Sequence, residues 1–259
     1  MTPLLELYLD QLILFVLVLT RVSGLVMTAP IFGSRSVPFR VRGLLAVALA
    51  MIVTSLYLGH EVPLPGNIIE MTLMLAREGV LGLLLGMSVQ ILFSGLQLTG
   101  QIIGQMSGMS LADVFDPTFN QSVPVFAQLL ETMALSFFIA IGGHRLLIRA
   151  LLETFRWRPP GVHDLPAGII AALTDVIHQS FLMGIRAGAP VMVALLMAIL
   201  VLGLISRTLP QLNVIAVGFS LNAMVMMVTL ALSLGAVAWV LQERTELVIE
   251  SMTEVLTGM

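Results

Sequence analysis

Two long stretches without a charged residue constrain this chain more than any other feature of its sequence. Residues 79–112 and 208–242 are 34 and 35 consecutive uncharged residues. Because a transmembrane helix needs about 20 predominantly apolar residues, each stretch is long enough to cross a bilayer. Charged residues make up only 10% of the chain, against roughly 25% in an ordinary soluble domain. The sequence therefore predicts an all-α, membrane-type protein.

The composition also narrows the classes of function. The chain has no cysteine, which excludes disulfides, thiol catalysis and thiolate metal sites. A net charge of −3 provides no basic surface for nucleic acid. Asp113 and Asp116 have no histidine nearby, and no phosphate-binding or zinc-protease motif occurs. We therefore expect neither an enzyme nor a cofactor or metal site.

Apolar stretches separated by helix breakers predict six helical regions: 11–32, 43–58, 68–109, 123–141, 168–205 and 212–241. The arginines of 35–42 and of 145–158 predict two cytoplasmic loops, since arginine-rich short loops tend to stay inside. Residues after Gln242 are expected to form an acidic, amphipathic tail.

Six plain crossings would place these two arginine-rich segments on opposite sides of the membrane. We therefore expect one region not to cross, and region 79–121 is the best candidate for a re-entrant element. Five crossings then remain, with the N-terminus outside and the C-terminus inside. In a second interpretation, some helices pack only on sister subunits and never contact lipid.

Glycines at helical spacing mark region 79–108. They share nearly one helix face, as small residues do where helices pack closely: Gly79, Gly82, Gly86, Gly100, Gly104 and Gly108. Four glutamines gather on the same side and need partners: Gln90, Gln97, Gln101 and Gln105. A helix seam within the chain and a seam or channel lining between subunits are both open interpretations.

The segment MSGMSLADVFDPTFNQ at 106–121 mixes methionine and phenylalanine with aspartate and proline. It cannot be helical throughout, and long irregular loops are often functional. Because methionine side chains adapt to changing surfaces, we interpret the segment as a gate or plug. A simple extracytoplasmic connector is the alternative.

Ionisable residues inside apolar stretches form a second group of candidates. Asp175 and His178 resemble a proton relay, but an ion pair or an interfacial position is the stronger interpretation. Arg77, Glu78 and Glu131 are each expected to pair with another group, to face a lumen or to lie outside lipid. A proton-coupled secondary transporter for small solutes, with helices broken at Pro190 and Pro210, is the rival function, although no inverted repeat supports it. A passive scaffold is a third possibility.

Three segments carry a resemblance to a known family. RVSGLVMTAPIFGSRSVPFRVR (21–42), QLTGQIIGQMSGMSLADVFDP (97–117) and GLISRTLPQLNVIAVGFSLN (203–222) resemble the FliR family. This is the R-type subunit of the flagellar type III export gate, similar to the T-type subunit of virulence injectisomes.

The resemblance implies more than the residues show. It implies helical hairpins packed into a hetero-oligomeric helical ring, in the bacterial inner membrane at the flagellar basal body. Residues 1–160 would be like the P-type gate subunit and 161–259 like the Q-type subunit. The implied partners are those two subunits, the B-type switch subunit and the A-type export subunit, with unfolded flagellar proteins as cargo.

The resemblance also assigns the plug loop to 106–121, where it would close the export channel. The plug or gate residues it implies are Gln101, Gln105, Met106, Met109, Phe115, Asp116, Pro117 and Phe119.

Overall fold

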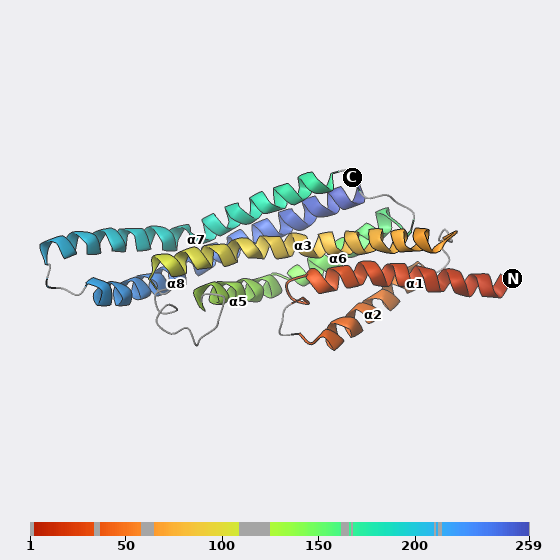
Figure 1. Ribbon diagram of the computed structural model, residues 1–259, viewed down its shortest axis with the longest axis horizontal. Helices are drawn as coiled ribbons and strands as arrows, with labels where there is room; N and C mark the ends of the chain where they lie inside the picture. Colours follow the sequence, from red (N-terminus) through yellow and green to blue (C-terminus); the bar gives the residue numbers. More distant parts are fainter. Residues whose placement is uncertain are drawn as a thin grey trace. The chain divides into compact units, whose positions relative to one another are not determined.

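The computed structural model of the chain describes residues 3–33, 37–57, 65–108, 125–161, 166, 168–209, 211 and 214–258. The helices in these residues (Figure 1) are α1 (Pro3–Thr28), α2 (Phe39–Leu56), α3 (Ile68–Met106), α5 (Val125–Ala140), α6 (Gly143–Trp157), α7 (Ile169–Thr208) and α8 (Val214–Thr257). No strand occurs in the described ranges. The all-α prediction is confirmed.

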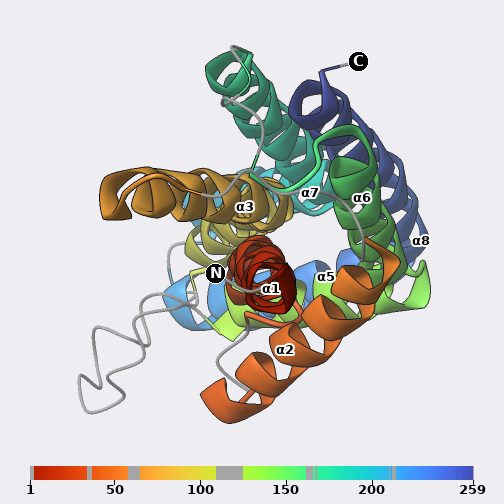
Figure 2. The same ribbon diagram turned by 90° about the vertical axis from the view of Figure 1, so that its right-hand side faces the viewer.

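The helices are grouped into two compact units, each built from separate stretches of the chain. The first unit comprises 1–91, 142–177 and 245–259, and the second comprises 92–141 and 178–244. In the first unit α2 packs against α1 (Figure 2). The division expected between residues 160 and 161 describes similarity to two other gate subunits, whereas the two units are defined by compact packing. The packing therefore does not test the expected division, which stays a prediction.

Among the helices of the described residues, five are long and apolar enough to cross a membrane, namely α1, α2, α3, α7 and α8. The number agrees with the prediction, but the members differ, because α3 is one of the five. α5 has only 16 residues and is joined to α6 at a bend of 65°. Gly142, with a φ of 77°, forms the break between them. The pair counts as a sixth span if it is taken together.

α3 differs from the re-entrant element expected to begin at Gly79. It is one helix of 39 residues with no proline, about 58 Å long at 1.5 Å per residue. Glycine lowers helix propensity, but most glycines of α3 lie against another helix, so tertiary packing holds the backbone. The part of the expected element from 109 to 121 lies outside the described residues.

α6 corrects the prediction of an arginine-rich loop at 145–158. Its buried residues recur at helical spacing: Gly143, Leu147, Ala150, Leu151, Thr154 and Phe155. The arginines Arg145, Arg149 and Arg156 are exposed. The segment is therefore an amphipathic helix, and the arginines that suggested a loop form its polar face.

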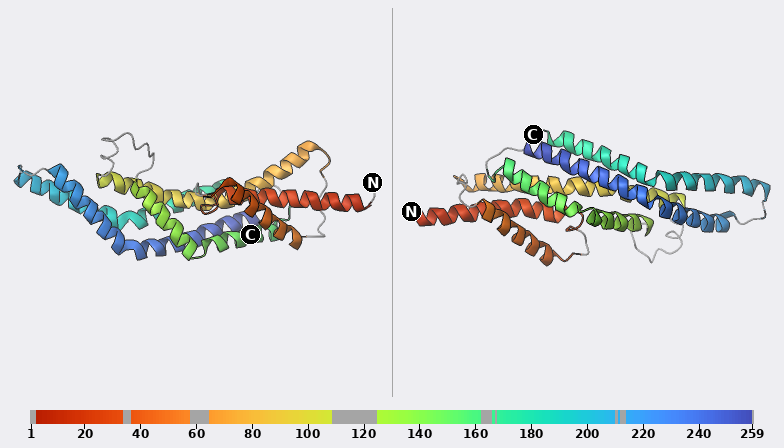
Figure 3. Two further views of the ribbon diagram at one scale, coloured as in Figure 1. Left: turned by 90° about the horizontal axis from the view of Figure 1, so that it is seen from below. Right: turned by 180° about the vertical axis from the view of Figure 1, so that it is seen from behind.

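α7 and α8 run side by side as a hairpin (Figure 3). α7 continues through Pro190, so the helix break that a transporter would need at this residue is not present. Pro210 lies outside the described residues. α8 continues past Leu241 to Thr257, and the expected tail is therefore the last part of this helix.

Candidate functional site

The first half of α3 makes a close backbone contact with α1 in the first unit. A Cβ atom added at Gly24 would lie 2.8 Å from the carbonyl oxygen of Gly79. A Cβ at Gly82 would collide with the carbonyl oxygen of Arg21, and one at Gly86 would lie 2.9 Å from that of Leu25. No side chain fits between these backbones, so the glycines allow the two helices to approach.

The second half of α3 makes similar contacts in the second unit, with other partners. A Cβ at Gly100 would lie 2.6 Å from Cα of Ala127 in α5. A Cβ at Gly184 of α7 would lie 2.5 Å from the carbonyl oxygen of Gly95. Gly104 is buried. A seam within the chain therefore exists at these positions.

Gly108 has a different environment from the other glycines of the series. It lies two residues after Met106, the last residue of α3, with a φ of 81°, and nothing lies within 4 Å of a Cβ added there. Its amide donates to the carbonyl oxygen of Gln105 at 3.1 Å. Gly108 ends the helix in a left-handed turn and does not pack against a neighbouring helix in the described residues.

One glutamine of α3 has a side-chain partner on α5. Gln97 Nε2 donates to Glu131 Oε2 over 2.8 Å, and both residues are half-buried. Gln101 is half-buried, whereas Gln90 and Gln105 are exposed. The expected pairing of Glu131 is thus with a side-chain amide of α3.

The end of α3 reaches an apolar cluster of the second unit that is rich in methionine. Ile103 of α3 belongs to one cluster with buried residues of α5, α7 and α8, including Phe126, Val191 and Met226. Half-buried methionines pack on this cluster: Met106, Met133 and Met192. Met106 is the one plug residue of the loop that the structure describes, and Met109, Phe115, Asp116, Pro117 and Phe119 lie outside the described residues.

A fully buried ion pair joins α1 to α3 in the first unit, so Glu78 pairs as one of the expectations had it, with a partner that sequence reasoning did not identify. Arg21 Nε lies 2.6 Å from Glu78 Oε2, and the side chains are only 1% and 5% exposed. Both charges were visible in apolar stretches of the sequence. Their pairing was not, because 57 positions separate them.

The same two side chains also bind the backbone after α6. Nη1 and Nη2 of Arg21 each donate to the carbonyl oxygen of Arg158 over 3.1 Å. Glu78 Oε1 accepts the amide hydrogen of Gly161 over 3.0 Å. The guanidinium lies 4.2 Å from the ring centroid of Phe155, a cation–π contact. The pair therefore fixes the turn that leads out of α6.

Tyr57, directly after α2, lies close to this pair. Its ring centroid is 6.2 Å from that of Phe155. Burial raises the pKa of Tyr57 above its ordinary value, while the positive charges of Arg21 and Arg156 act in the opposite direction. The neutral phenol is thus the favoured form beside the ion pair.

The candidates for a proton relay are not enclosed. Asp175, His178 and Arg186 of α7 are all exposed within this chain. Among the residues that the structure describes, no group of three His, Cys, Asp or Glu side chains is arranged to hold a metal ion.

Comparison with known proteins identifies the family. The sequence profile of the family described as "Bacterial export proteins, family 1" matches residues 12–248. The flagellar biosynthetic protein FliR of Escherichia coli (strain K12) is 35% identical over 218 residues, which cover 84% of this chain and 82% of that protein. This chain belongs to the FliR family.

Other members of the FliR family match over nearly the whole chain. FliR of Bacillus subtilis (strain 168) is 31% identical over 248 residues, 93% of this chain and 94% of that protein. FliR of Caulobacter vibrioides is 29% identical over 235 residues, 90% and 93% of the two chains. The resemblance carried by the three sequence motifs is therefore confirmed, and the transporter alternative is not supported.

Proposed function

We propose that this chain is a subunit of the flagellar protein-export gate and helps to form and close the channel for unfolded flagellar proteins. The observation that carries the proposal is the match of an export family over residues 12–248, together with relatives named flagellar biosynthetic proteins. The described part of the chain holds five apolar helices long enough to span a bilayer, which suits a membrane-embedded component of this kind. The inner membrane and the flagellar basal body are the proposed location.

The proposed mechanism involves no bond chemistry in this chain. Its partners are the P-type and Q-type gate subunits, the B-type switch subunit and the A-type export subunit, which supply recognition and energy. The chain supplies the loop 106–121, whose methionines and phenylalanines form a deformable seal around cargo of varied sequence. The methionines packed at the end of α3 support this proposal, since they give the loop an adaptable base.

Native mass spectrometry tests the assembly. The chain is extracted in detergent after co-expression with its neighbouring apolar gene products. We expect a defined hetero-oligomer containing one copy of this chain. A stable monomer or homodimer that ignores those partners would contradict the proposal.

A leak assay tests the plug separately from assembly. Deletion of residues 110–120 is expected to raise the passage of small molecules across the membrane, whereas the hetero-oligomer should still form. Replacement of the same residues by a Gly/Ser linker is the control for loop length. If both variants assemble and remain as tight as the intact gate, the chain is a scaffold and the loop is passive.

A further inference from the structure

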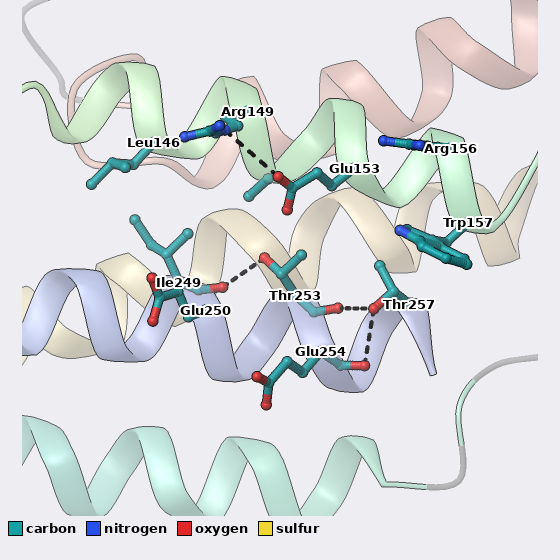
Figure 4. Close-up of a pocket in the computed structure, with 11 residues that line it drawn as sticks. Leu146, Arg149, Glu153, Arg156, Trp157, Ile249, Glu250, Thr253, Glu254 and Thr257 are labelled. Carbon is teal, nitrogen blue, oxygen red and sulfur yellow. Dashed lines mark hydrogen bonds and ion pairs between the residues drawn. The ribbon is translucent and has the colours of Figure 1, made fainter. Parts of the chain in front are cut away.

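A groove lies between α6 and the last turns of α8 in the first unit, apart from the ion-pair site. Its volume is about 470 Å³. Figure 4 shows the two helices side by side, with Trp157 and Thr257 facing each other at one end. Trp157 is 51% exposed, although a large aromatic side chain is the kind of residue that protein interfaces bury.

The two walls of the groove carry opposite charges. α6 contributes Arg149, Glu153 and Arg156, which together carry a net positive charge, and α8 contributes Glu250 and Glu254. All five side chains are exposed. Arg149 contacts Glu153 of its own helix at 3.6 Å, a pair that is weak because both side chains are well solvated. The walls therefore present a basic edge and an acidic edge to an incoming partner.

The lining between these edges is mostly apolar. It includes Leu146 and Ala150 of α6 and Ile249 of α8, with the hydroxyl-bearing Thr253 beside them, and all but Leu146 are buried. An apolar floor between polar rims is the pattern by which proteins bind amphipathic helices.

We propose that this groove binds an amphipathic helix of a partner protein, with acidic residues along its edge on α6 and basic residues along its edge on α8. A lipid headgroup or another anion would be repelled by Glu250 and Glu254, and a purely basic segment would be repelled by the arginines. Turning the helix end to end exchanges its two edges, so the charges also select the direction in which it lies. This inference goes beyond the proposed export role, which assigns no function to this groove.

Designed peptides test the charge pattern on the full-length chain in detergent. The probe is a labelled helix of about five turns (roughly 18 residues), with a leucine stripe, glutamates on one edge and lysines on the other. Arg149→Glu/Arg156→Glu and Glu250→Arg/Glu254→Arg should each weaken binding about tenfold at low salt. The variant carrying all four substitutions should recover binding to within about twofold of the parent chain, because the helix then binds in the opposite direction.

The matched control is Arg40→Glu/Asp175→Arg, which changes two exposed charges elsewhere in the first unit and should leave binding unchanged.

A second experiment, protection of a thiol from alkylation, needs no charge substitution. Because the chain has no cysteine, Leu146→Cys gives one reactive thiol in the groove, which bound peptide should protect from alkylation. Leu152→Cys, exposed on α6 and not part of the groove, should stay reactive.

Equal binding by all variants, or no recovery in the variant with four substitutions, would overturn the proposal. So would equal alkylation of both thiols with and without peptide. Stronger binding of phosphatidylglycerol vesicles than of the peptide would identify a lipid site and overturn it as well.

Discussion

The two halves of α3 use the same glycine spacing to build two different kinds of contact. In residues 68–91 the helix lies on the backbone of α1 and carries Glu78, which forms a fully buried ion pair with Arg21. In residues 92–106 it lies on α5 and α7 and carries Gln97, which forms a half-buried hydrogen bond with Glu131. The second half then ends among methionines.

This difference means that the contacts of α3 hold one end of the helix in place, whereas the contacts at its other end can rearrange; we call the second end the adjustable half. A buried ion pair tolerates little displacement, because any movement leaves a charge without its partner in a low-dielectric surrounding. An amide bonded to a half-exposed carboxylate can exchange with water at small cost. Methionine side chains adapt to new neighbours. The adjustable half is the one that leads into residues 109–121, the proposed plug.

The largest loss of stability is expected from Glu78→Gln. Removing the carboxylate charge leaves the Arg21 guanidinium buried without a counter-charge, which costs about 3–5 kcal/mol. Thermal unfolding of the purified chain in detergent measures the loss. The double variant Arg21→Met/Glu78→Gln should recover much of the stability, since no unpaired charge remains. A single variant as stable as the parent would show that the ion pair does not hold this half.

A smaller loss is expected from Gly82→Ala. The added methyl group collides with the carbonyl oxygen of Arg21, so α1 and α3 must separate, at a cost of about 1–3 kcal/mol. Gly203→Ala in α7 is the control, because nothing lies within 4 Å of its Cβ and alanine favours a helix interior by about 0.5–1 kcal/mol. If Gly82→Ala and Gly203→Ala are equally stable in thermal unfolding, the close backbone contact between α1 and α3 is contradicted.

The sequence predicted the fold class and the small-residue face of α3, because helical periodicity and residue size are local properties, but it left open whether this face packs within the chain or between subunits. Gly82 and Gly100 could be placed on one face from their spacing alone. The pairing of Arg21 with Glu78 could not be predicted, since it depends on how two distant helices are brought together. α6 was missed for another reason: four arginines within 145–158 dominated the interpretation and concealed the buried spacing of Leu147, Leu151 and Phe155.

A moderate effect is expected at the end of the adjustable half. Gly108→Ala places an L-residue at a φ of 81°, which costs about 1–2 kcal/mol. Gly108→Asn should cost less, because asparagine adopts this conformation more readily. Thermal unfolding shows which of the two variants is the less stable. If alanine is tolerated as well as asparagine, the helix does not end in the left-handed turn, and the boundary between α3 and the loop lies elsewhere.

The smallest effect is expected from Glu131→Gln, the same substitution as Glu78→Gln in the other half of the comparison. The new amide oxygen can still accept the hydrogen bond from Gln97 Nε2, and no opposite charge is left unpaired, so the loss should be below about 1 kcal/mol. Parallel thermal unfolding of the two glutamine variants compares a buried carboxylate paired with a guanidinium and a half-buried carboxylate bonded to a neutral amide, because the substitution itself is identical. A loss of stability in Glu131→Gln as large as that in Glu78→Gln would mean that both halves of α3 are fixed. The proposal that the second half gives the plug an adjustable base would then be wrong.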